Sequence, residues 1–574
     1  MKKKTVKRIL LAVIIIPILI VAYFLAPYVI NLIARPYNLN TYKERLAKKE
    51  KLQPVSYYLS QNGNDNDNGR TKSTAWKNIK KINETEFNPG DSILLEGTQT
   101  FVGNIVFDEY DLGTQKKPIF IGSYGNGKAI IDAEKGTGIK ALNSEGIHVS
   151  NLIIKGDGAD KNEGSGISFV NNLRGEIKLD FIRIDSIETY GFGWWGILVD
   201  GNRKKSGYRN VTIEYCNVHS NGDAGLYIYG DYNLVSKTYA HENVYIRNVK
   251  AYNNLGRADN YENTGSGIVI SDTDNGVIER CEAYNNGALC HSTMGGPVGI
   301  WAWDARNIII QYNESYNNKT GATKDGGGFD LDGGMVNSIM QYNYSHDNEG
   351  SGFFLAEFTY SRAHSGNIIR YNISENDGRK NGYAGIDIWG DVEDAYVYNN
   401  TIFLSPAVKD TPSALFIRPN IELSDPKFPK NIIISNNIFV ASGNVFLVNN
   451  KKQIASVKLI NNDYYNSDSN FVFKWEGKIF SSFEEWRKNS LQEKEGNILY
   501  GFTADPMWQH TTATDSLNVR AKILFYNLQP ASTLIDKGTN VQQLYKIKNV
   551  MQDINGIKLP QLSGFDLGAC EFEK

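Results

Sequence analysis

The chain has little cysteine and no surplus of charge of either sign. Four cysteines among 574 residues are too few to build a disulfide framework. The 61 Lys and Arg residues nearly balance the 63 Asp and Glu residues, which indicates neither a broadly basic nucleic-acid binder nor an acidic solvated tail. Tyr and Gly are abundant instead, at 33 and 54 residues. With many Asn residues, this composition favours an all-β protein with repeated tight turns over a helical bundle.

The first residues combine basic side chains with a long apolar run. Residues 1–8 carry five Lys or Arg side chains, and residues 9–33 are almost entirely apolar. That run can cross a bilayer, which needs about 20 apolar residues. It lacks the short core and the small-residue cleavage site of a signal peptide, which favours an uncleaved anchor. We therefore expect a basic cytoplasmic tail over 1–8, a single transmembrane helix over 9–33, a charged stalk over 34–55 and an exported body at the cell surface or in the periplasm.

One pattern recurs between about residues 196 and 418. A small residue is followed by an apolar residue at the first and third positions after it, without exception. The segments begin at Gly196, Gly225, Gly267, Gly299, Gly328, Gly352, Gly385 and Ala414. Alternation with a period of two on short strands, repeated with turns between, predicts stacked parallel strands with one face inside.

A second column consists of asparagines. These residues occupy one position of successive segments: Asn313, Asn343, Asn372, Asn400, Asn437 and Asn462. Stacked amides can hydrogen-bond along such a column. The two columns predict an all-β fold, with an N-terminal cap and first coils over 56–155, a parallel β-helix with a groove over 156–475, and a C-terminal extension over 476–574.

With these repeats, residues 55–475 resemble the right-handed parallel β-helix proteins of the pectate-lyase-like superfamily. The opening YYLSQNGNDNDNGRTKSTAWKNIKKIN and the ending LIDKGTNV…GFDLGACEFE resemble the two ends of bacterial carbohydrate-active members. The resemblance implies that the repeated strand is the first of each coil, that long loops precede it, and that its outward face forms a groove. The Asn-Thr-Asp and Gly-His-Gly signatures of polygalacturonases and the Asp-Pro-His-Asp of alginate C5-epimerases are missing, so no catalytic set carries over.

The outward positions of these strands carry aromatic side chains near the middle of the repeat. Flat rings with polar tips suit an amphipathic ligand such as a sugar. The alternative is that they pack under the loops before the strands. The residues that we expect to bind substrate are Tyr227, Tyr229, Trp301, Trp303, Asp304 and Trp389, with Lys324 and Arg379 in the preceding loops.

Asp330 and Asp332 lie two residues apart in KDGGGFDLDGG. On a strand they point the same way with Cα atoms about 6.6 Å apart. Like charges that close raise at least one pKa, giving the acid and carboxylate that glycoside hydrolysis needs. Glu357 or Asp387 is the alternative partner. Two other interpretations stay open: a calcium site of Asp325, Asp330 and Asp332 amid glycines, or hydrogen bonds that cap the loops.

His346 aligns with a column of mostly Tyr residues, which favours a stacked histidine over a catalytic one. We keep it, with Lys324 and Tyr383, as a candidate base of a lyase. Three functions remain: a membrane-anchored glycoside hydrolase that requires no cofactor, a calcium-dependent polysaccharide lyase or epimerase, and a non-catalytic polysaccharide-binding or export scaffold. In each case we expect a polysaccharide partner, no nucleic acid and a monomer.

Overall fold

The computed structural model describes residues 39–202, 205–421, 426–452, 456–509, 519–547 and 550–573. The expected basic tail and transmembrane helix lie outside these residues. In the described part of the chain, no helix is long and apolar enough to cross a membrane. The chain divides into two compact units, Met1–Lys48 and Lys49–Lys574. Helix α2 (Leu39–Lys49) occupies the region predicted to be a charged stalk.

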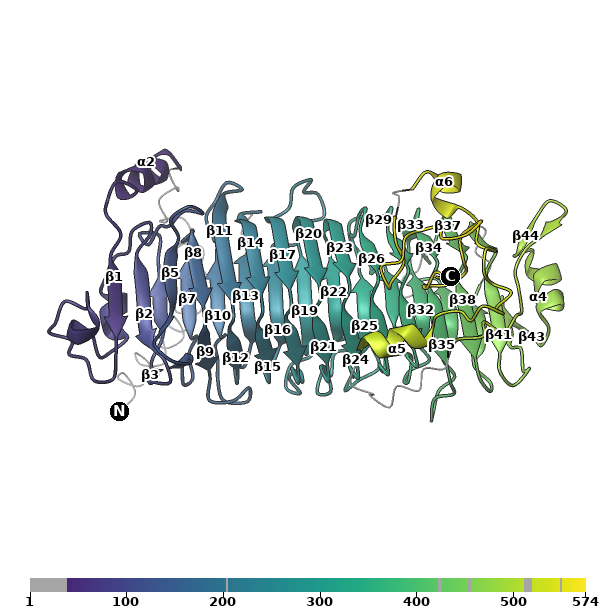
Figure 1. The fold of residues 1–574 in the computed structure, drawn as a ribbon, viewed down its shortest axis with the longest axis horizontal. Coiled ribbons are helices and arrows are strands. Elements are labelled where there is room, and N and C mark those ends of the chain that lie inside the picture. Colours follow the sequence, from purple (N-terminus) through teal and green to yellow (C-terminus); the bar gives the residue numbers. More distant parts are fainter. Residues whose placement is uncertain are drawn as a thin grey trace, which may run out of the picture. The chain divides into compact units, whose positions relative to one another are not determined.

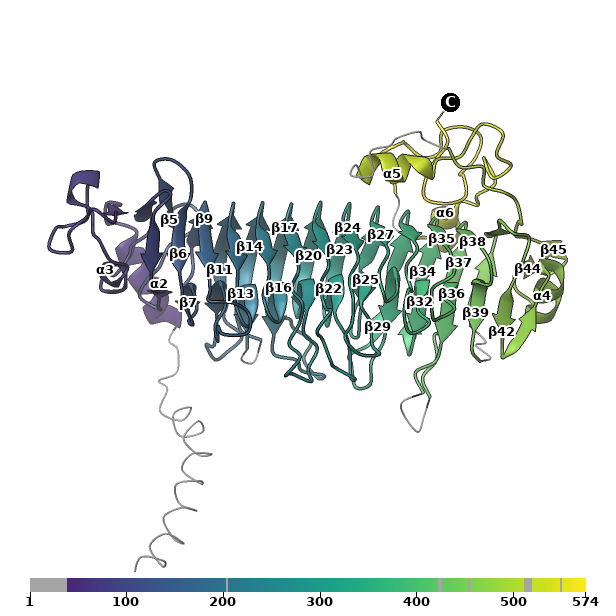
Figure 2. The ribbon, with the colours of Figure 1, turned by 90° about the horizontal axis from the view of Figure 1, so that it is seen from below.

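The second unit is a parallel β-helix built from three long sheets (Figures 1 and 2). The sheet that carries the repeated strands is called the groove sheet. Its strands are, in spatial order, β4 (Ile105–Phe107), β7 (Ile139–Leu142), β10 (Ile167–Val170), β13 (Trp195–Gly201), β16 (Ala224–Gly230), β19 (Ser266–Ser271), β22 (Val298–Trp303), β25 (Gly327–Leu331), β28 (Phe353–Ala356), β32 (Ala384–Trp389), β36 (Ser413–Arg418), β39 (Phe446–Asn450), β42 (Phe473–Trp475) and the antiparallel β43 (Lys478–Phe480).

The second and third strands of each coil form the other two sheets. The second sheet contains β1 (Ser56–Leu59), β2 (Ser92–Glu96), β5 (Ile119–Tyr124), β8 (Ile147–Ser150), β11 (Lys178–Asp185), β14 (Gly207–Glu214), β17 (His241–Arg247), β20 (Thr273–Glu279), β23 (Arg306–Gln311), β26 (Ile339–Gln341), β30 (Ile368–Arg370), β34 (Tyr396–Tyr398), β37 (Ile432–Ser435) and β40 (Val457–Ile460). The third contains β3 (Thr100–Val102), β6 (Ala129–Asp132), β9 (Leu152–Lys155), β12 (Glu188–Tyr190), β15 (Asn217–His219), β18 (Lys250–Tyr252), β21 (Glu282–Tyr284), β24 (Glu314–Tyr316), β27 (Tyr344–His346), β31 (Ile373–Glu375), β35 (Thr401–Leu404), β38 (Ile438–Ala441) and β41 (Asp463–Asn466).

The alternation of the repeated strands matches their burial. Ile268 and Ile270, the apolar positions of β19, have no exposed surface, and the same holds for the equivalent pair in each of the other repeated segments. Burying one such side chain contributes about 1.5–3 kcal/mol. The predicted inward face is therefore confirmed, and stacked apolar columns form the core of the solenoid.

The predicted asparagine ladder lies in the turn between the second and third sheets. Asn313 Nδ2 donates to Asn343 Oδ1 at 3.0 Å, and Asn343 donates to Asn372 at the same distance. The bonds continue through Asn400 and Asn437 and end with Asn462, whose Nδ2 donates to Glu493 Oε1 at 2.8 Å.

A second ladder, not predicted from the sequence, lies in the turn before the groove sheet. Its members bond in order at 2.8–3.1 Å: Asn221, Asn254, Asn286, Asn318, Asn348 and Asp377. This ladder explains the small residue of the repeat. A Cβ on Gly299 would lie 2.7 Å from Asn318 Nδ2, and one on Gly328 would lie 2.9 Å from Asn348 Nδ2, so a larger side chain would displace the ladder.

The C-terminal extension contains α4 (Phe483–Ser490), the short hairpin β44 (Lys494–Glu495) and β45 (Ile498–Leu499), α5 (Val519–Phe525) and α6 (Val541–Tyr545). It turns back along the solenoid (Figure 2). Tyr526 and Ile554 pack in a cluster with Tyr342 and Tyr371, which immediately precede ladder asparagines. Tyr342 OH also donates to the Gln552 carbonyl at 2.9 Å. The extension thus covers the first asparagine ladder.

Candidate functional site

The outward side chains of the groove sheet form columns along the solenoid. In the best-defined column, each residue pairs in register with the next: Tyr227, Val269, Trp301, Asp330, Phe354, Asp387, Phe416, Asn449 and Lys474. Beside it, Ala356, Trp389 and Arg418 are partners on successive strands. Since neighbouring strands are about 4.8 Å apart, these columns place aromatic, acidic and basic side chains along one continuous face.

A pocket of about 570 Å³ opens on this face around Asp330 and Asp332. Its apolar wall contains Phe354, Tyr383 and Trp389, which pack together with Ala356. The full lining is Met294, Gly295, Lys324, Asp325, Asp330, Asp332, Phe354, Ala356, Phe358, Tyr383, Trp389, Arg418, Pro419, Ile421, Lys451, Lys452, Lys474 and Gly477. This space is called the acidic pocket below.

The carboxyl groups of Asp330 and Asp332 both have a raised pKa, but they differ in their hydrogen bonds. Asp330 is only 3% exposed, and its Oδ1 has no hydrogen-bond partner among the described residues. Burial raises the pKa of Asp330 well above its usual value, and the charges of Asp332, Asp325 and Asp387 raise it further. Burial also raises the pKa of Asp332, to about 7. The Gly333 N–H, which donates to Asp332 Oδ1 at 2.7 Å, acts in the opposite direction and lowers this pKa. The predicted effect of like charges is present, but burial is the larger cause.

Glu357 lies near this pair but is not among the residues that line the acidic pocket. Its carboxylate accepts hydrogen bonds from the Ser361 hydroxyl and, at 3.4 Å, from the Gly334 N–H. Burial raises the pKa of Glu357 to about 8, with a smaller contribution from the charge of Asp332. Glu357 is thus coupled to the acidic pocket electrostatically while its side chain is held under the loop that follows β28.

Asp387 is held by a cation instead of acting as a free partner for Asp330. Arg418 Nε and Nη2 donate to its two oxygens at 3.1 and 2.8 Å, and Ser351 Oγ donates at 3.2 Å. Asp387 has no exposed surface. The prediction of Asp387 as a catalytic carboxylate finds no support in this geometry, because both of its oxygens are occupied.

A second pocket, of about 220 Å³, adjoins the first and holds most of the predicted aromatic platforms. Trp303 Nε1 donates to Tyr227 OH at 3.1 Å, and Trp301 Nε1 donates to Ser266 Oγ at the same distance. Asp332 and Phe358 line both pockets. Tyr227, Trp301, Trp303 and Trp389 therefore lie along one groove with Asp332 between them, as predicted, although Trp301 is only 7% exposed.

Two further predicted sugar contacts lie away from the pockets. Tyr229 stacks edge-on against Tyr227, with ring centroids 5.5 Å apart, and lines neither pocket. The Arg379 guanidinium donates to the backbone carbonyls of Asp377 and Pro406 at 3.0 and 3.3 Å. The prediction that Arg379 contacts substrate is not supported, since these bonds hold it in a turn.

His346 belongs to β27 in the third sheet, so the structure does not bring it to the groove. Its ring stacks on Tyr316 at 4.7 Å, and Nε2 lies 3.1 Å from Glu314 Oε1. The expected stacking of His346 is found, and a catalytic role beside Asp330 has no support in this geometry because the two side chains belong to different sheets.

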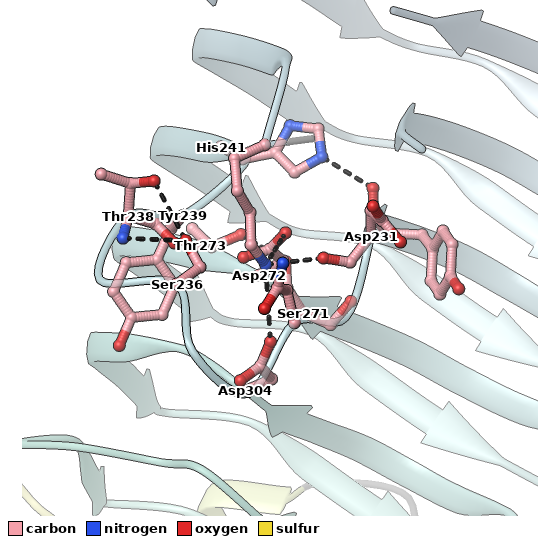
Figure 3. Close-up of polar contacts among 12 residues, drawn as sticks. Asp231, Ser236, Thr238, Tyr239, His241, Ser271, Asp272, Thr273 and Asp304 are labelled. Carbon is pink, nitrogen blue, oxygen red and sulfur yellow. Dashed lines mark hydrogen bonds and ion pairs between the residues drawn. The ribbon is translucent and has the colours of Figure 1, made fainter. Parts of the chain in front are cut away.

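Asp304 is wholly buried and forms an ion pair with Arg362, so it is unavailable to a substrate. Figure 3 shows Asp304 close to Asp272, beside the loop that carries Ser236 and Tyr239. Lys205 Nζ lies 2.8 Å from Asp272 Oδ2 and 4.0 Å from Asp304 Oδ2. Two buried acids and two cations thus compensate one another, and together they hold successive coils at this corner. The prediction of Asp304 as a substrate contact is not supported by this geometry.

The sequence interpretation missed the basic side of the acidic pocket. Arg418 was not among the predicted site residues, and Lys451 and Lys474 fall outside the repeat that defined the columns. The sequence positions of Lys451 and Lys474 could have revealed them. Lys451 directly follows one apolar strand and Lys474 lies within another, and both strands extend the groove sheet beyond residue 418. Asp223, in the second pocket, was missed as well; burial raises its pKa to about 7.

The calcium hypothesis receives no geometric support. Among the described residues, no three His, Cys, Asp or Glu side chains gather closely enough to hold a metal ion. Asp325 Oδ2 instead accepts from the Gly296 N–H at 2.7 Å, and Tyr383 OH donates to its Oδ1 at 3.1 Å. A calcium requirement remains a prediction.

Comparisons with known proteins identify the fold. Residues 180–402 match the family model described as right handed beta helix region. No curated protein sequence matches the chain. The lacto-N-biosidase of family GH136 from Eubacterium ramulus, as its selenomethionine derivative, has a TM-score of 0.51 at 18% identity, covering 73% of this chain and 69% of that one.

Two other solved structures are similar with lower scores. XylC in complex with xylose has a TM-score of 0.49 at 12% identity over 91% of this chain and 99% of that one. The pectate lyase Pel9A has a TM-score of 0.41 at 15% identity, with coverages of 92% and 98%. At these identities the likeness concerns the fold alone. The family model and the strand topology confirm the predicted fold, and the chain is a right-handed parallel β-helix protein.

Proposed function

We propose that the chain is a glycoside hydrolase that cleaves a polysaccharide bound along the groove sheet. The observation that carries this proposal is the pairing of Asp330 and Asp332 in one pocket with different surroundings, since Asp330 Oδ1 has no partner among the described residues and Asp332 Oδ1 accepts from the Gly333 N–H. Burial and the neighbouring acids raise the pKa of Asp330 well above its usual value, which favours its protonated form, while a pKa of about 7 leaves much of Asp332 ionised at neutral pH. Hydrolysis by two carboxyl groups needs one of each form.

Asp330 is then the general acid, which protonates the oxygen of the bond that breaks. Asp332 is the carboxylate, either as the base that takes a proton from water or as the nucleophile at the sugar carbon. Trp389 on one side of Asp332, and Trp301 and Trp303 on the other, supply flat surfaces for the sugars that flank this bond.

A specific observation favours a second candidate, a polysaccharide lyase or epimerase. Lys324, Tyr383 and Arg418 line the same pocket, and such a reaction needs a base together with a cation that neutralises a uronate. The third candidate is a binding or export scaffold without turnover. Because one fold hosts many reactions, the pocket residues and not the fold decide among these.

We further propose that residues 9–33 anchor the protein in a membrane with the β-helix exported. This proposal rests on the apolar run and its basic flank in the sequence. Polysaccharides of the cell surface or surroundings would then be the accessible substrates.

The test incubates the full-length chain with acidic and neutral bacterial and plant glycans, and follows new reducing ends together with the ultraviolet absorbance of unsaturated uronates. Reducing ends without absorbance, lost in Asp330→Asn, are the expected result. Absorbance rising with the reducing ends would favour the lyase. Glycan binding without any turnover would favour the scaffold and exclude the hydrolase.

A further inference from the structure

Three of the five Lys and Arg side chains that line the acidic pocket belong to strands β36 and β42 or directly follow β39. Arg418 ends β36, Lys451 directly follows β39, and Lys474 is the central residue of β42. All three line the pocket. They are called the basic cluster below.

Only one member of the basic cluster has a counter-ion among the described residues. Arg418 is paired with Asp387, whereas Lys451 and Lys474 form no ion pair in the described part of the chain. Their ammonium groups lie over the rings of Phe416 and Phe446, at 5.3 and 5.6 Å from the centroids. A cation above a ring is weakly stabilised and remains able to bind an anion.

The cations also repel one another. The pKa of Lys451 is lowered by burial and by the charges of Arg418 and Lys474, and the charge of Asp387 only partly opposes this. Positive charges held together at a pocket wall, with too few acids to balance them, are stabilised when an anion binds there.

The basic cluster is offset from the carboxyl pair along the solenoid. Along the register of the groove sheet, Asp387 lies two strands from Asp330. The next strand, three from Asp330, carries Phe416 and Arg418. Lys474 is two strands further. At about 4.8 Å per strand, the strand of Arg418 is about 14 Å from that of Asp330. The Arg418 guanidinium reaches back to 5.6 Å from the centroid of the Phe354 ring, one strand from Asp330. It is therefore an anion bound at Lys451 and Lys474, further along the solenoid, that is not on the sugar that meets Asp330.

We propose that the basic cluster is a subsite for a carboxylate or sulfate group carried by the polysaccharide, at a sugar remote from the bond at Asp330 and Asp332. The inference rests on the proposed function in taking the groove as the place where the polysaccharide lies. It deepens that function by assigning the ligand to the anionic glycans. The subsite selects the chain and sets its position along the groove, and it takes no part in proton transfer.

The experiment measures equilibrium binding to the full-length chain carrying Asp330→Asn, so that turnover does not consume the ligand. The probes are polygalacturonate, dextran sulfate and neutral dextran of matched length. Lys451→Gln with Lys474→Gln keeps the side-chain stems and removes two charges. Lys488→Gln with Lys494→Gln, at exposed positions that line neither pocket, removes the same charge elsewhere. Thermal unfolding of both double variants checks the fold.

We expect at least one anionic probe to bind more tightly than dextran, with an affinity that falls as salt rises. Lys451→Gln with Lys474→Gln should weaken that binding about tenfold, and the control pair should change it less than twofold. Preference for polygalacturonate or for dextran sulfate then identifies the anion. No preference for either anionic probe, or equal loss in both double variants, overturns the inference. If binding depends on the two lysines but the wild-type chain shows no turnover, the subsite is supported and the hydrolase is excluded.

Discussion

Arg418 binds both carboxylate oxygens of Asp387, with Nε 3.1 Å from Oδ1 and Nη2 2.8 Å from Oδ2. The Asp387 side chain is wholly buried and that of Arg418 is 22% exposed. A bidentate pair fixes the plane of the guanidinium, so Asp387 orients a cation that lines the acidic pocket. The residue expected as a catalytic acid thus positions the wall of the site.

Replacing Arg418 by Gln should destabilise the fold, because the buried carboxylate of Asp387 loses its counter-ion. Breaking a buried pair in this way costs about 3–5 kcal/mol. The denaturant concentration at the midpoint of unfolding measures the effect. Adding Asp387→Asn should restore part of the loss, and an unchanged midpoint in Arg418→Gln would show that the pair contributes nothing.

Replacing Asp330 by Asn should abolish the general acid while keeping the side-chain shape. We expect kcat to fall by about 100- to 10,000-fold, with glycan affinity changed only a few-fold. Initial rates of reducing-end formation and equilibrium binding measure the two quantities. Asp67→Asn, at an exposed position outside both pockets, is the control, and full turnover by Asp330→Asn would refute the assignment.

The rate should depend on pH through the two carboxyl groups of the acidic pocket. Asp332, with a pKa of about 7, must lose its proton, whereas Asp330, whose pKa is raised well above its usual value, must keep its own. We therefore expect kcat/KM to rise with pH through about 7 and to fall at higher pH. A profile between about pH 5 and pH 9 that is flat, or that falls throughout, contradicts these roles.

Glu357 should make the fold less stable as pH rises. Its pKa is about 8 in the folded chain against 4.5 ordinarily, so the folded state retains a proton that the unfolded state releases. Its contribution is greatest below about pH 4.5, falls as pH rises to about 8, and is then constant. Glu357→Gln, which stays neutral, should flatten this part of the profile of unfolding midpoint against pH. The exposed Glu485→Gln should not.

Chelation separates the hydrolase from the calcium-dependent alternative. No metal-binding group of three His, Cys, Asp or Glu side chains occurs in the described residues, so turnover should be unchanged after dialysis against a calcium chelator. Activity lost on chelation and restored by added calcium would favour the lyase or epimerase.

Much of the fold could be predicted because its repeat is local in sequence. Ile268 and Ile270 alternate with outward residues on one short strand, so their burial follows from the pattern. The asparagine at position 343 has a counterpart in the next coil, Asn372, so the ladder bond between them follows as well. That Asp330 and Asp332 line one pocket could also be expected, since alternate residues of an extended segment share a face, although β25 ends at Leu331 and Asp332 directly follows it.

The environment of those residues was decided by tertiary structure. Asp304 was expected in the groove, yet Arg362, which is 58 residues further along the chain, holds it in the interior. Lys451 and Lys474 reach the acidic pocket only because the later coils stack onto the groove sheet. The sequence by itself determined which residues alternate inward and outward, because that depends on the backbone of a single strand. Only the tertiary structure decided which outward charges meet and which are buried, because loops of different lengths and the stacking of distant coils set those contacts.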